Sequence, residues 1–366
     1  MSNFKVFNSS KWAMFATGEN ILFKNNFIDG CMLNNKNCQI DGWLPCIGTY
    51  AISPELPIMS SNITFTDNEV ANSWGEAIDL IMCSGCTVKN NYVHDVFPFA
   101  IYMDNSQNCV IESNTIKFTN YSICSNYSKY MAIVLGDEVR STKMVPMLNI
   151  TIRNNFVWGA QFGVGYWGWN DIAYYSDVTV ANNIFFNISM LALGFQTACV
   201  VKNKTKNNQF KNNFIYSNYP WGSAIVNESE ISTWNISDNV YYGGSNKILE
   251  DSWNGTDGMS HSVHFKKEEI GLEQFWQGGL YGNCTNESYF DVNVKPYCFV
   301  PYKNSILYHS GVHVKYTDLD GKIDKDYFGF VRNKYKPSIG FAEGKMDSRA
   351  NNITVVVFII ILFVLF

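Results

Sequence analysis

A short pattern that recurs eight times along the chain constrains its fold more than any other feature. Segments such as NITFTDNEV (62–70) and NITIRNNFV (149–157) place one asparagine between an apolar residue three positions before it and another two positions after it. The eight asparagines are Asn26, Asn68, Asn91, Asn114, Asn155, Asn183, Asn213 and Asn239. A unit of this kind cannot bury its apolar face alone, so neighbouring units must stack on one another.

Within each unit, apolar and polar residues alternate before the asparagine, which predicts a β-strand. We expect the asparagine to lie at a bend, to take the left-handed backbone conformation there, and to join its counterparts in a hydrogen-bonded ladder. A second strand follows, with aligned segments such as AIDL (77–80), AIYM (100–103) and AIVL (132–135). Strand, bend and strand at this period predict a parallel β-helix, with two lateral insertions near residues 31–60 and 126–147.

The repeat resembles the right-handed parallel β-helix of the pectin-lyase-like superfamily over about residues 20–245, on motifs such as NNYVHDVFPFAIYM and NNFVWGAQFGVGYW. FWQGGLYGN (275–283), FVPYKNSILYHSG (299–311) and PSIGFAEG (337–344) are similar to the C-terminal closing segment of many such proteins. The resemblance implies an all-β fold: a right-handed solenoid over residues 1–250, a closing segment over 251–343 and a hydrophobic tail over 344–366. It implies no single activity, because the superfamily includes lyases, hydrolases, epimerases and surface proteins.

The polar character of the chain comes from amides rather than charges. Only 16% of the 366 residues are charged, against about 25% in ordinary soluble domains. The 43 asparagines outnumber all 32 acidic residues. The net charge is −5 and the basic residues are thinly spread, which excludes a nucleic-acid partner, since such binding needs clustered lysine and arginine. We expect a monomer.

The sequons point to the secretory route, because Asn-x-Ser/Thr is a glycan acceptor only there. They stand at Asn8, Asn62, Asn120, Asn126, Asn149, Asn187, Asn203, Asn227, Asn235, Asn254, Asn283, Asn286 and Asn352. The ten cysteines lack the spacing of a zinc module, and we expect disulfides, as in an oxidising compartment. The sequence therefore predicts a disulfide-containing glycoprotein.

The C-terminus predicts membrane attachment. An apolar run over residues 353–366 is shorter than the roughly 20 residues of a spanning helix, and small residues such as Gly344, Ser348 and Ala350 precede it. This pattern favours a cleaved glycolipid-anchor signal, with a short single-pass anchor as the alternative. The first 20 residues have no apolar signal-peptide core, so we expect an incomplete start. The predicted location is the extracellular face of the plasma membrane.

Acidic residues gather on one predicted face. Ile78 and its equivalents should point inward, which leaves Asp79, Tyr102 and Val134 outside on adjacent coils about 4.8 Å apart. Two carboxylates about 5–5.5 Å apart suit a retaining glycosidase, and about 6.5–9.5 Å an inverting one. The candidate catalytic residues, on three successive rungs, are Glu76, Asp79, Asp104 and Asp137.

Aromatic residues lie near these acids, where a ring can stack on a sugar. The candidate substrate-binding residues are Tyr102, Tyr166, Trp167, Trp169 and Arg140. We interpret this face as a groove that binds or cleaves a polysaccharide or glycoconjugate. A glycosidase is favoured over a lyase or epimerase, because a lyase needs a basic residue and the chain has only four arginines.

A non-catalytic alternative remains open for the same face. The acids could be solvated strand residues and the tryptophans a cover over the barrel, in a non-catalytic surface protein that binds glycans or shields the cell. No cofactor and no metal motif is predicted, although aspartates on adjacent rungs offer the oxygen ligands that calcium prefers.

Overall fold

The computed structural model describes residues 1–35, 38, 44–119, 130–138, 145–168, 172–195, 203–217, 225–226, 233–243, 263–265, 276, 291, 293–301, 305–316, 318 and 324–342. Several sequence predictions fall outside these residues. They concern Arg140, Trp169, the sequons at Asn120, Asn126, Asn227, Asn254, Asn283, Asn286 and Asn352, and the tail over residues 344–366.

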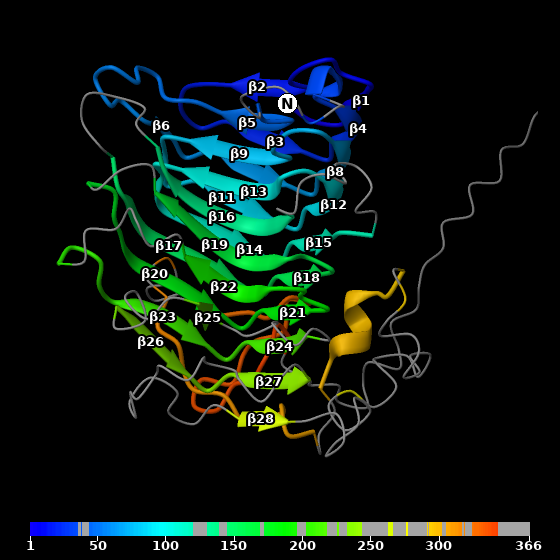
Figure 1. Ribbon diagram of the computed structural model, residues 1–366, viewed down its shortest axis with the longest axis vertical. Helices are drawn as coiled ribbons and strands as arrows, with labels where there is room; N and C mark the ends of the chain where they lie inside the picture. Colours follow the sequence, from blue (N-terminus) through cyan, green and yellow to red (C-terminus); the bar gives the residue numbers. More distant parts are fainter. Residues whose placement is uncertain are drawn as a thin grey trace, which may run out of the picture.

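Three long parallel sheets, which we call A, B and C, run along the axis of the molecule (Figure 1). Sheet A carries the strands before the repeated asparagines: β3 (Leu22–Lys24), β7 (Thr64–Thr66), β11 (Thr87–Lys89), β14 (Gln107–Glu112), β17 (Met147–Arg153), β20 (Tyr175–Ala181), β23 (Asn208–Lys211) and β26 (Trp234–Ser237), flanked by β6 (Ser60–Ser61) and β10 (Cys83–Ser84).

Sheet B follows the asparagines. It contains β1 (Lys5–Phe7), β4 (Phe27–Cys31), β8 (Glu69–Ser73), β12 (Tyr92–Val96), β15 (Thr115–Lys117), β18 (Phe156–Trp158), β21 (Ile184–Phe186), β24 (Phe214–Ser217), β27 (Val240–Gly243) and β28 (Val263–Phe265). Sheet C contains β2 (Met14–Ala16), β5 (Ile47–Thr49), β9 (Ile78–Ile81), β13 (Phe99–Asp104), β16 (Met131–Asp137), β19 (Phe162–Gly168), β22 (Leu191–Phe195) and β25 (Ile225–Val226).

Each coil of the solenoid passes once through sheets A, B and C, and successive coils pair in parallel. Val88 on β11, for example, pairs with Phe65 on the coil before and Ile111 on the coil after. The predicted all-β parallel solenoid is therefore confirmed. The two long spacings contain ordinary strands of sheet C, since β5 lies within residues 31–60 and β16 within 126–147.

The asparagine ladder runs unbroken between sheets A and B. Each side-chain amide nitrogen donates to the side-chain oxygen of the next asparagine over 2.8–3.1 Å, from Asn26 to Asn239. That oxygen also accepts the donor asparagine's own backbone N–H, as Asn155 does from Asn114. The eight asparagines are at most 2% exposed, so the ladder supplies the buried backbone groups of the bend with partners.

The left-handed conformation falls one residue earlier than predicted. The residues with φ of 53–58° are Asn25, Asp67, Asn90, Ser113, Asn154, Asn182, Asn212 and Asp238. One asparagine cannot both join the ladder and take the left-handed turn position, because the ladder side chain points inward and the turn residue faces out. Short polar side chains tolerate this conformation best, which explains the asparagine, aspartate and serine of the turn column. The ladder column is asparagine at all eight positions because each ladder side chain has to donate and accept.

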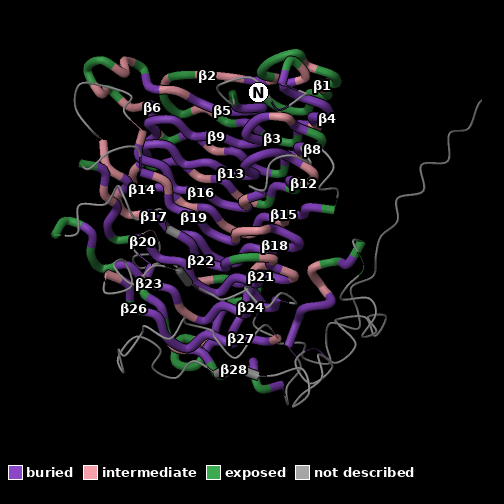
Figure 2. The backbone as a smooth tube through the Cα atoms, in the orientation of Figure 1, coloured by how far each residue is buried: buried purple, intermediate pink, exposed green. Residues whose placement is uncertain are grey.

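Buried apolar residues of all three sheets fill the interior of the solenoid. Figure 2 shows most of the strands as buried. Phe23 and Phe65, for instance, are fully buried and stack with ring centroids 4.5 Å apart. The predicted disulfides include two described pairs, Cys31–Cys46 and Cys83–Cys86. Cys109 is a buried free thiol, and burial raises its pKa to about 12.

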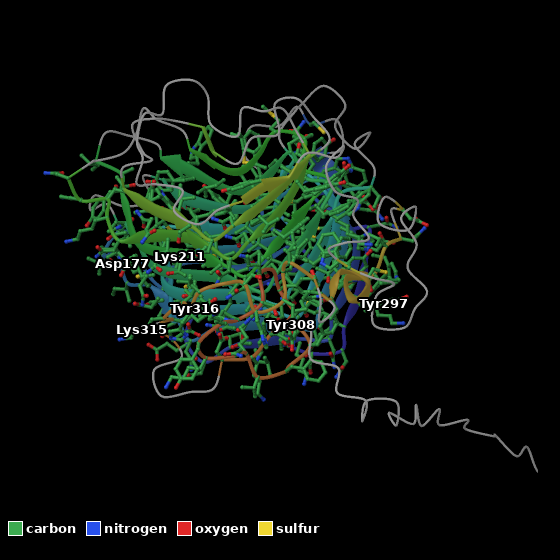
Figure 3. The ribbon with its side chains drawn as sticks, turned by 90° about the horizontal axis from the view of Figure 1, so that it is seen from below. Asp177, Lys211, Tyr297, Tyr308, Lys315 and Tyr316 are labelled. Carbon is green, nitrogen blue, oxygen red and sulfur yellow. A yellow bond between two sulfur atoms is a disulfide. The ribbon has the colours of Figure 1, made fainter. Side chains whose placement is uncertain are left out.

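The closing segment lies along the side of the solenoid, over the outer face of sheet B. Aromatic residues of sheet B such as Phe156 and Phe186 pack against Trp276, Phe299 and Phe341 of that segment. Figure 3, a view along the long axis, shows Tyr297, Tyr308 and Tyr316 on this part of the chain, beside the barrel. In the part of the chain that the structure describes, no helix is long and apolar enough to cross a membrane.

Outward-facing turn residues hold the closing segment in place. The Asn182 amide donates to the Tyr316 hydroxyl over 2.5 Å, and the Asn212 amide donates to the Val312 carbonyl over 2.6 Å. The Arg153 guanidinium makes a two-pronged contact with the Asp318 carboxylate, at 2.8 Å for each nitrogen–oxygen pair. The turn residues, together with Arg153 at the end of β17, therefore also bind the closing segment.

Candidate acidic site

The strand register places Asp79 and Asp104 on the face that the alternation suggested. Tyr102 on β13 pairs with Asp79 on β9 and with Val134 on β16, and Asp104 pairs with Ile81 and Gly136. The residues between them belong to the central core. Asp79, Tyr102 and Asp104 therefore share the outer face of sheet C, on neighbouring rungs.

Three carboxyl groups on this face are buried. Glu76 is 6% exposed, Asp79 1% and Asp104 0%. Burial, reinforced by the charge of Asp79, raises the pKa of Glu76 well above its ordinary value. The charges of Asp104 and Glu138 act in the same direction. A carboxyl group with a raised pKa holds its proton to higher pH, as general-acid catalysis requires.

Tyr102 and Glu138 complete the group. The Tyr102 hydroxyl donates to the Glu138 Oε1 atom over 3.0 Å, and burial followed by the charge of Asp104 raises the pKa of Tyr102. The tyrosine ring lies over Gly136, where an added Cβ would sit 2.2 Å from the hydroxyl oxygen. We call Glu76, Asp79, Tyr102, Asp104 and Glu138 the acid cluster.

Sequence reasoning did not identify Glu138. It directly follows Asp137 in the segment AIVLGDE, and the only signal was that second acid at the end of the strand. The chain leaves sheet C at this point, so the alternation no longer tells which side the next residue faces. Its backbone N–H donates to the Asn105 side chain, and this contact fixes its position.

Asp137 differs from the expected outer-face position. Its Oδ2 atom accepts the Tyr166 hydroxyl at 2.8 Å and the Tyr174 backbone N–H at 3.0 Å, and the residue is fully buried. Burial raises its pKa, although the bond from Tyr166 acts in the opposite direction. Asp137 has the inward parity of Leu135 along β16, so it belongs to the barrel interior.

The predicted sugar-binding aromatic residues are mostly covered. Tyr166 is a core residue whose ring lies 4.3 Å from that of Tyr175, so it cannot act as an open stacking platform. Tyr102 is 2% exposed and forms a small outer apolar cluster with Phe99 and Val134. Trp167 packs partly buried against that cluster. The carboxyl groups of Glu76, Asp79 and Asp104 are therefore buried on this face rather than open to solvent in a cleft.

The described sequon asparagines lie on the surface. Asn8, Asn62, Asn203 and Asn235 are exposed, and Asn149 and Asn187 are partly exposed. Asn62 and Asn149 belong to a second left-handed column, between sheets C and A, which also contains Asn20 and Asn108. Each of these two sequon asparagines donates to an outward-facing neighbour on the preceding coil. None of the six lies in the acid cluster.

Among the residues that the structure describes, no group of three or more histidine, cysteine, aspartate or glutamate side chains is arranged to hold a metal ion. His94 lies beside two acids on the outer face of sheet B. Its Nε2 atom is 3.3 Å from Glu69 Oε1, and its Nδ1 atom is 3.3 Å from Asp95 Oδ2. The bonds to these two carboxylates raise the pKa of His94 against the opposing effect of burial.

The chain was compared with known proteins. The family described as "right handed beta helix region" matches residues 1–185, which is half of the chain. No curated protein sequence matches it. Among solved structures, the complex of XylC with xylose has a TM-score of 0.43 at 12% identity and covers 89% of this chain and 50% of XylC.

Two further structures are similar to this chain at a comparable level. The tailspike protein of E. coli bacteriophage HK620 in complex with pentasaccharide has a TM-score of 0.44 at 11% identity, over 73% of this chain and 52% of the tailspike chain. The Streptococcus pneumoniae surface protein and adhesin PfbA has a TM-score of 0.43 at 10% identity, over 72% of this chain and 83% of the PfbA chain. This chain spans about half the length of XylC and of the tailspike. With its unbroken parallel coils and the family match over residues 1–185, the chain belongs to the right-handed β-helix family.

Proposed function

We propose that this protein is a cell-surface, carbohydrate-active β-helix glycoprotein whose acid cluster hydrolyses a glycosidic bond. The observation that carries the proposal is the convergence of Glu76, Asp79 and Asp104 on neighbouring rungs, with the pKa of Glu76 held well above its ordinary value. Glycoside hydrolysis uses one protonated and one ionised carboxyl group, and a raised pKa distinguishes the acid.

In this mechanism Glu76 is the proton donor. Its proton passes to the glycosidic oxygen as the bond to the anomeric carbon breaks. Asp104, on the next rung, is the ionised partner that attacks the anomeric carbon or activates the attacking water. Tyr102, on the same strand as Asp104 and held by Glu138, orients the carboxyl groups.

Burial of the cluster favours a second candidate, a non-catalytic surface protein that binds glycans or shields the cell. The three carboxyl groups are at most 6% exposed, so a substrate reaches them only if the residues that cover them move aside. A lyase or epimerase has less support, because a lyase needs a basic residue and the chain has only four arginines.

A hydrolysis assay separates the two candidates. The wild-type protein, Glu76→Gln and Asp104→Asn are incubated with a panel of neutral and acidic polysaccharides, and the products are separated by chromatography. We expect each variant to lower the rate by a factor of about 10²–10⁴. Asp177→Asn is the matched control, because this exposed residue lies on sheet A in a left-handed turn that asparagine accepts.

Two outcomes contradict the enzyme. Either both acid variants hydrolyse as fast as the wild-type protein, or the wild-type protein binds a glycan on the panel and releases no product from it. The second outcome establishes the non-catalytic candidate.

Location and glycosylation are tested separately. The surface-exposed sequons Asn8, Asn62, Asn203 and Asn235 support glycans on the solenoid. Treatment with an N-glycosidase should lower the mass of the protein purified from a secretory host. Release from intact cells by a phosphatidylinositol-specific phospholipase identifies a lipid anchor, whereas retention after that treatment points to a single-pass anchor.

A further inference from the structure

A pocket of about 300 Å³ opens between sheet B and the closing segment, on a different sheet from the acid cluster. Residues of β12, β15 and the bends before them form one wall, and Lys295, Pro296 and Tyr327 of the closing segment form the other. The volume lies at the lower end of the range of small-molecule sites. The pocket is polar as well as concave, which distinguishes it from a packing defect between two apolar surfaces.

Two lysines give the pocket a positive character. Lys117 is 3% exposed, and its ammonium group donates to the Val294 carbonyl oxygen, which holds it at the pocket wall. Burial, followed by the positive charge of Lys295, lowers the pKa of Lys117 to about 8. Asp291 and Asp95 act in the opposite direction but do not outweigh these effects. An anion between the two ammonium groups would relieve their repulsion.

Lys117 lies where the outer column of sheet B changes from polar to aromatic residues. Its strand neighbours in the outer column of sheet B are His94 on one side and Trp158 on the other. The column continues with Phe186, which stacks on Tyr216. From Trp158 onward the aromatic residues are covered by apolar side chains of the closing segment. At Lys117 the closing segment contributes the Val294 carbonyl and, across the pocket, Lys295, so two cations line the pocket where the apolar cover of the column ends.

The remaining lining suits a sugar ring. The Tyr327 hydroxyl and the Thr115 Oγ1 atom lie 2.7 Å apart, so each has a further lone pair or proton to offer a ligand hydroxyl. Tyr92 is 37% exposed, and its ring is held by stacking on the His94 imidazole at 4.4 Å. A partly exposed aromatic ring in a fixed orientation provides an apolar face beside these hydroxyl groups.

We propose that this pocket binds an anionic sugar, with Lys117 and Lys295 holding its carboxylate or sulfate, Tyr92 packing against its ring, and Thr115 and Tyr327 bonding to its hydroxyls. The site goes beyond the proposed hydrolysis, since it shares no residue with the acid cluster and lies on another sheet. It would let the solenoid hold an acidic glycan by one side while the outer face of sheet C remains free.

Calorimetric titration of the full-length protein tests the proposal. The probes are the methyl glycoside of glucuronic acid, glucose 6-sulfate, glucose and inorganic phosphate. We expect one or both charged sugars to bind at least tenfold more tightly than glucose and than phosphate. Which of the two binds identifies carboxylate or sulfate as the recognised group.

Lys295→Gln is the decisive variant, because this lysine is exposed and its replacement leaves the Lys117–Val294 bond in place. It should weaken binding of the charged sugar at least fivefold, and Lys295→Arg should restore most of it. Lys5→Gln, which removes an exposed lysine from β1, is the matched control and should bind as the wild-type protein does. Tyr92→Ala should weaken binding of the sugar and leave phosphate unaffected.

Three results overturn the proposal: no binding of either charged sugar, equal affinity of wild type and Lys295→Gln, or phosphate binding as tightly as the charged sugars. The last result reveals an anion site without sugar recognition. Asp104→Asn should leave binding unchanged, so failure of the hydrolysis proposal and failure of this one are distinguished by different variants.

Discussion

The side-chain amide of Asn114 donates to the side-chain oxygen of Asn155 over 3.0 Å, although 41 residues separate them. The link has the same length as that from Asn91 to Asn114, where only 23 residues intervene. The ladder therefore sets the stacking of coils independently of how much chain leaves the solenoid between them. Long excursions are tolerated because each coil returns to the same hydrogen-bond donor and acceptor.

Replacement of Asn114 by alanine should destabilise the protein by roughly 3 kcal/mol, because it leaves several buried polar groups without partners. The side chain also donates to the Val88 carbonyl and accepts both the backbone and side-chain N–H groups of Asn91. Urea unfolding followed by circular dichroism measures the change. Asn293→Ala, at an exposed position, is the control and should alter the free energy of unfolding by less than about 0.5 kcal/mol. Equal effects of the two substitutions would exclude a stabilising ladder.

The raised pKa of Glu76 predicts a pH dependence of stability. A carboxyl group whose pKa is higher in the native state binds its proton more tightly there than in the unfolded chain, where the ordinary value is 4.5. Its contribution to the free energy of unfolding is therefore complete below about pH 4.5 and is lost as pH rises toward the native pKa.

Glu76→Gln isolates this contribution, since glutamine stays neutral. The difference in unfolding free energy, variant minus wild type, should increase with pH above 4.5 with a slope of up to about 1.4 kcal/mol per pH unit. Urea titrations between pH 4 and pH 8 measure it. Asp137, whose pKa is raised as well, contributes equally to both proteins and cancels. A difference that stays constant across the range would show that Glu76 ionises normally.

Gly136 is expected to tolerate no side chain. A Cβ there would lie 2.2 Å from the Tyr102 hydroxyl oxygen, so Gly136→Ala should displace the ring from Glu138 and cost about 1–3 kcal/mol. Gly165→Ala, on the same face of the next strand, should cost less, because the nearest atom to its Cβ would be the flexible Met131 sulfur at 3.3 Å. Thermal unfolding compares the two variants. If Gly165→Ala lowers the unfolding temperature more than Gly136→Ala does, the predicted clash with Tyr102 is wrong.

Arg153 should anchor the closing segment. It is 4% exposed and bonds to Glu112 on the solenoid and Asp318 on the closing segment. These two carboxylates raise the pKa of Arg153 despite the opposing effect of burial. Arg153→Met leaves them facing each other without a cation, and we expect a loss of about 3–5 kcal/mol and faster proteolysis of the closing segment.

Glu112→Gln serves as the comparison for Arg153→Met. Glu112 is more exposed than Arg153, and its substitution leaves the contact with Asp318 intact, so the cost should be at most about 1 kcal/mol. Proteolytic fragments identified by mass spectrometry show whether the closing segment is released first. Cleavage within the solenoid at the same rate would contradict the anchoring role.

Much of the fold could be predicted because one column of residues repeats. The alternation around Asn91 and Asn155 specified strands, and the alignment of Asp79 with Tyr102 gave the register that the structure shows. The left-handed residue was placed one position late, because ladder and turn both favour asparagine and a single sequence does not separate them. Asp137 and Tyr166 were assigned to the outer face although they lie inside, and the alternation itself gives both residues the inward parity of Leu135.

The sequence by itself determined the stacking of the coils and the inward and outward columns, because these follow from local alternation repeated along the chain. Only the tertiary structure decided that the Glu76 carboxyl is buried beside Asp79 with a raised pKa. It alone brought Lys117 and Lys295, 178 residues apart in sequence, to one pocket. Burial and charge proximity depend on what packs over a strand, and the closing segment that packs over sheet B carries no repeat from which its contacts could be predicted.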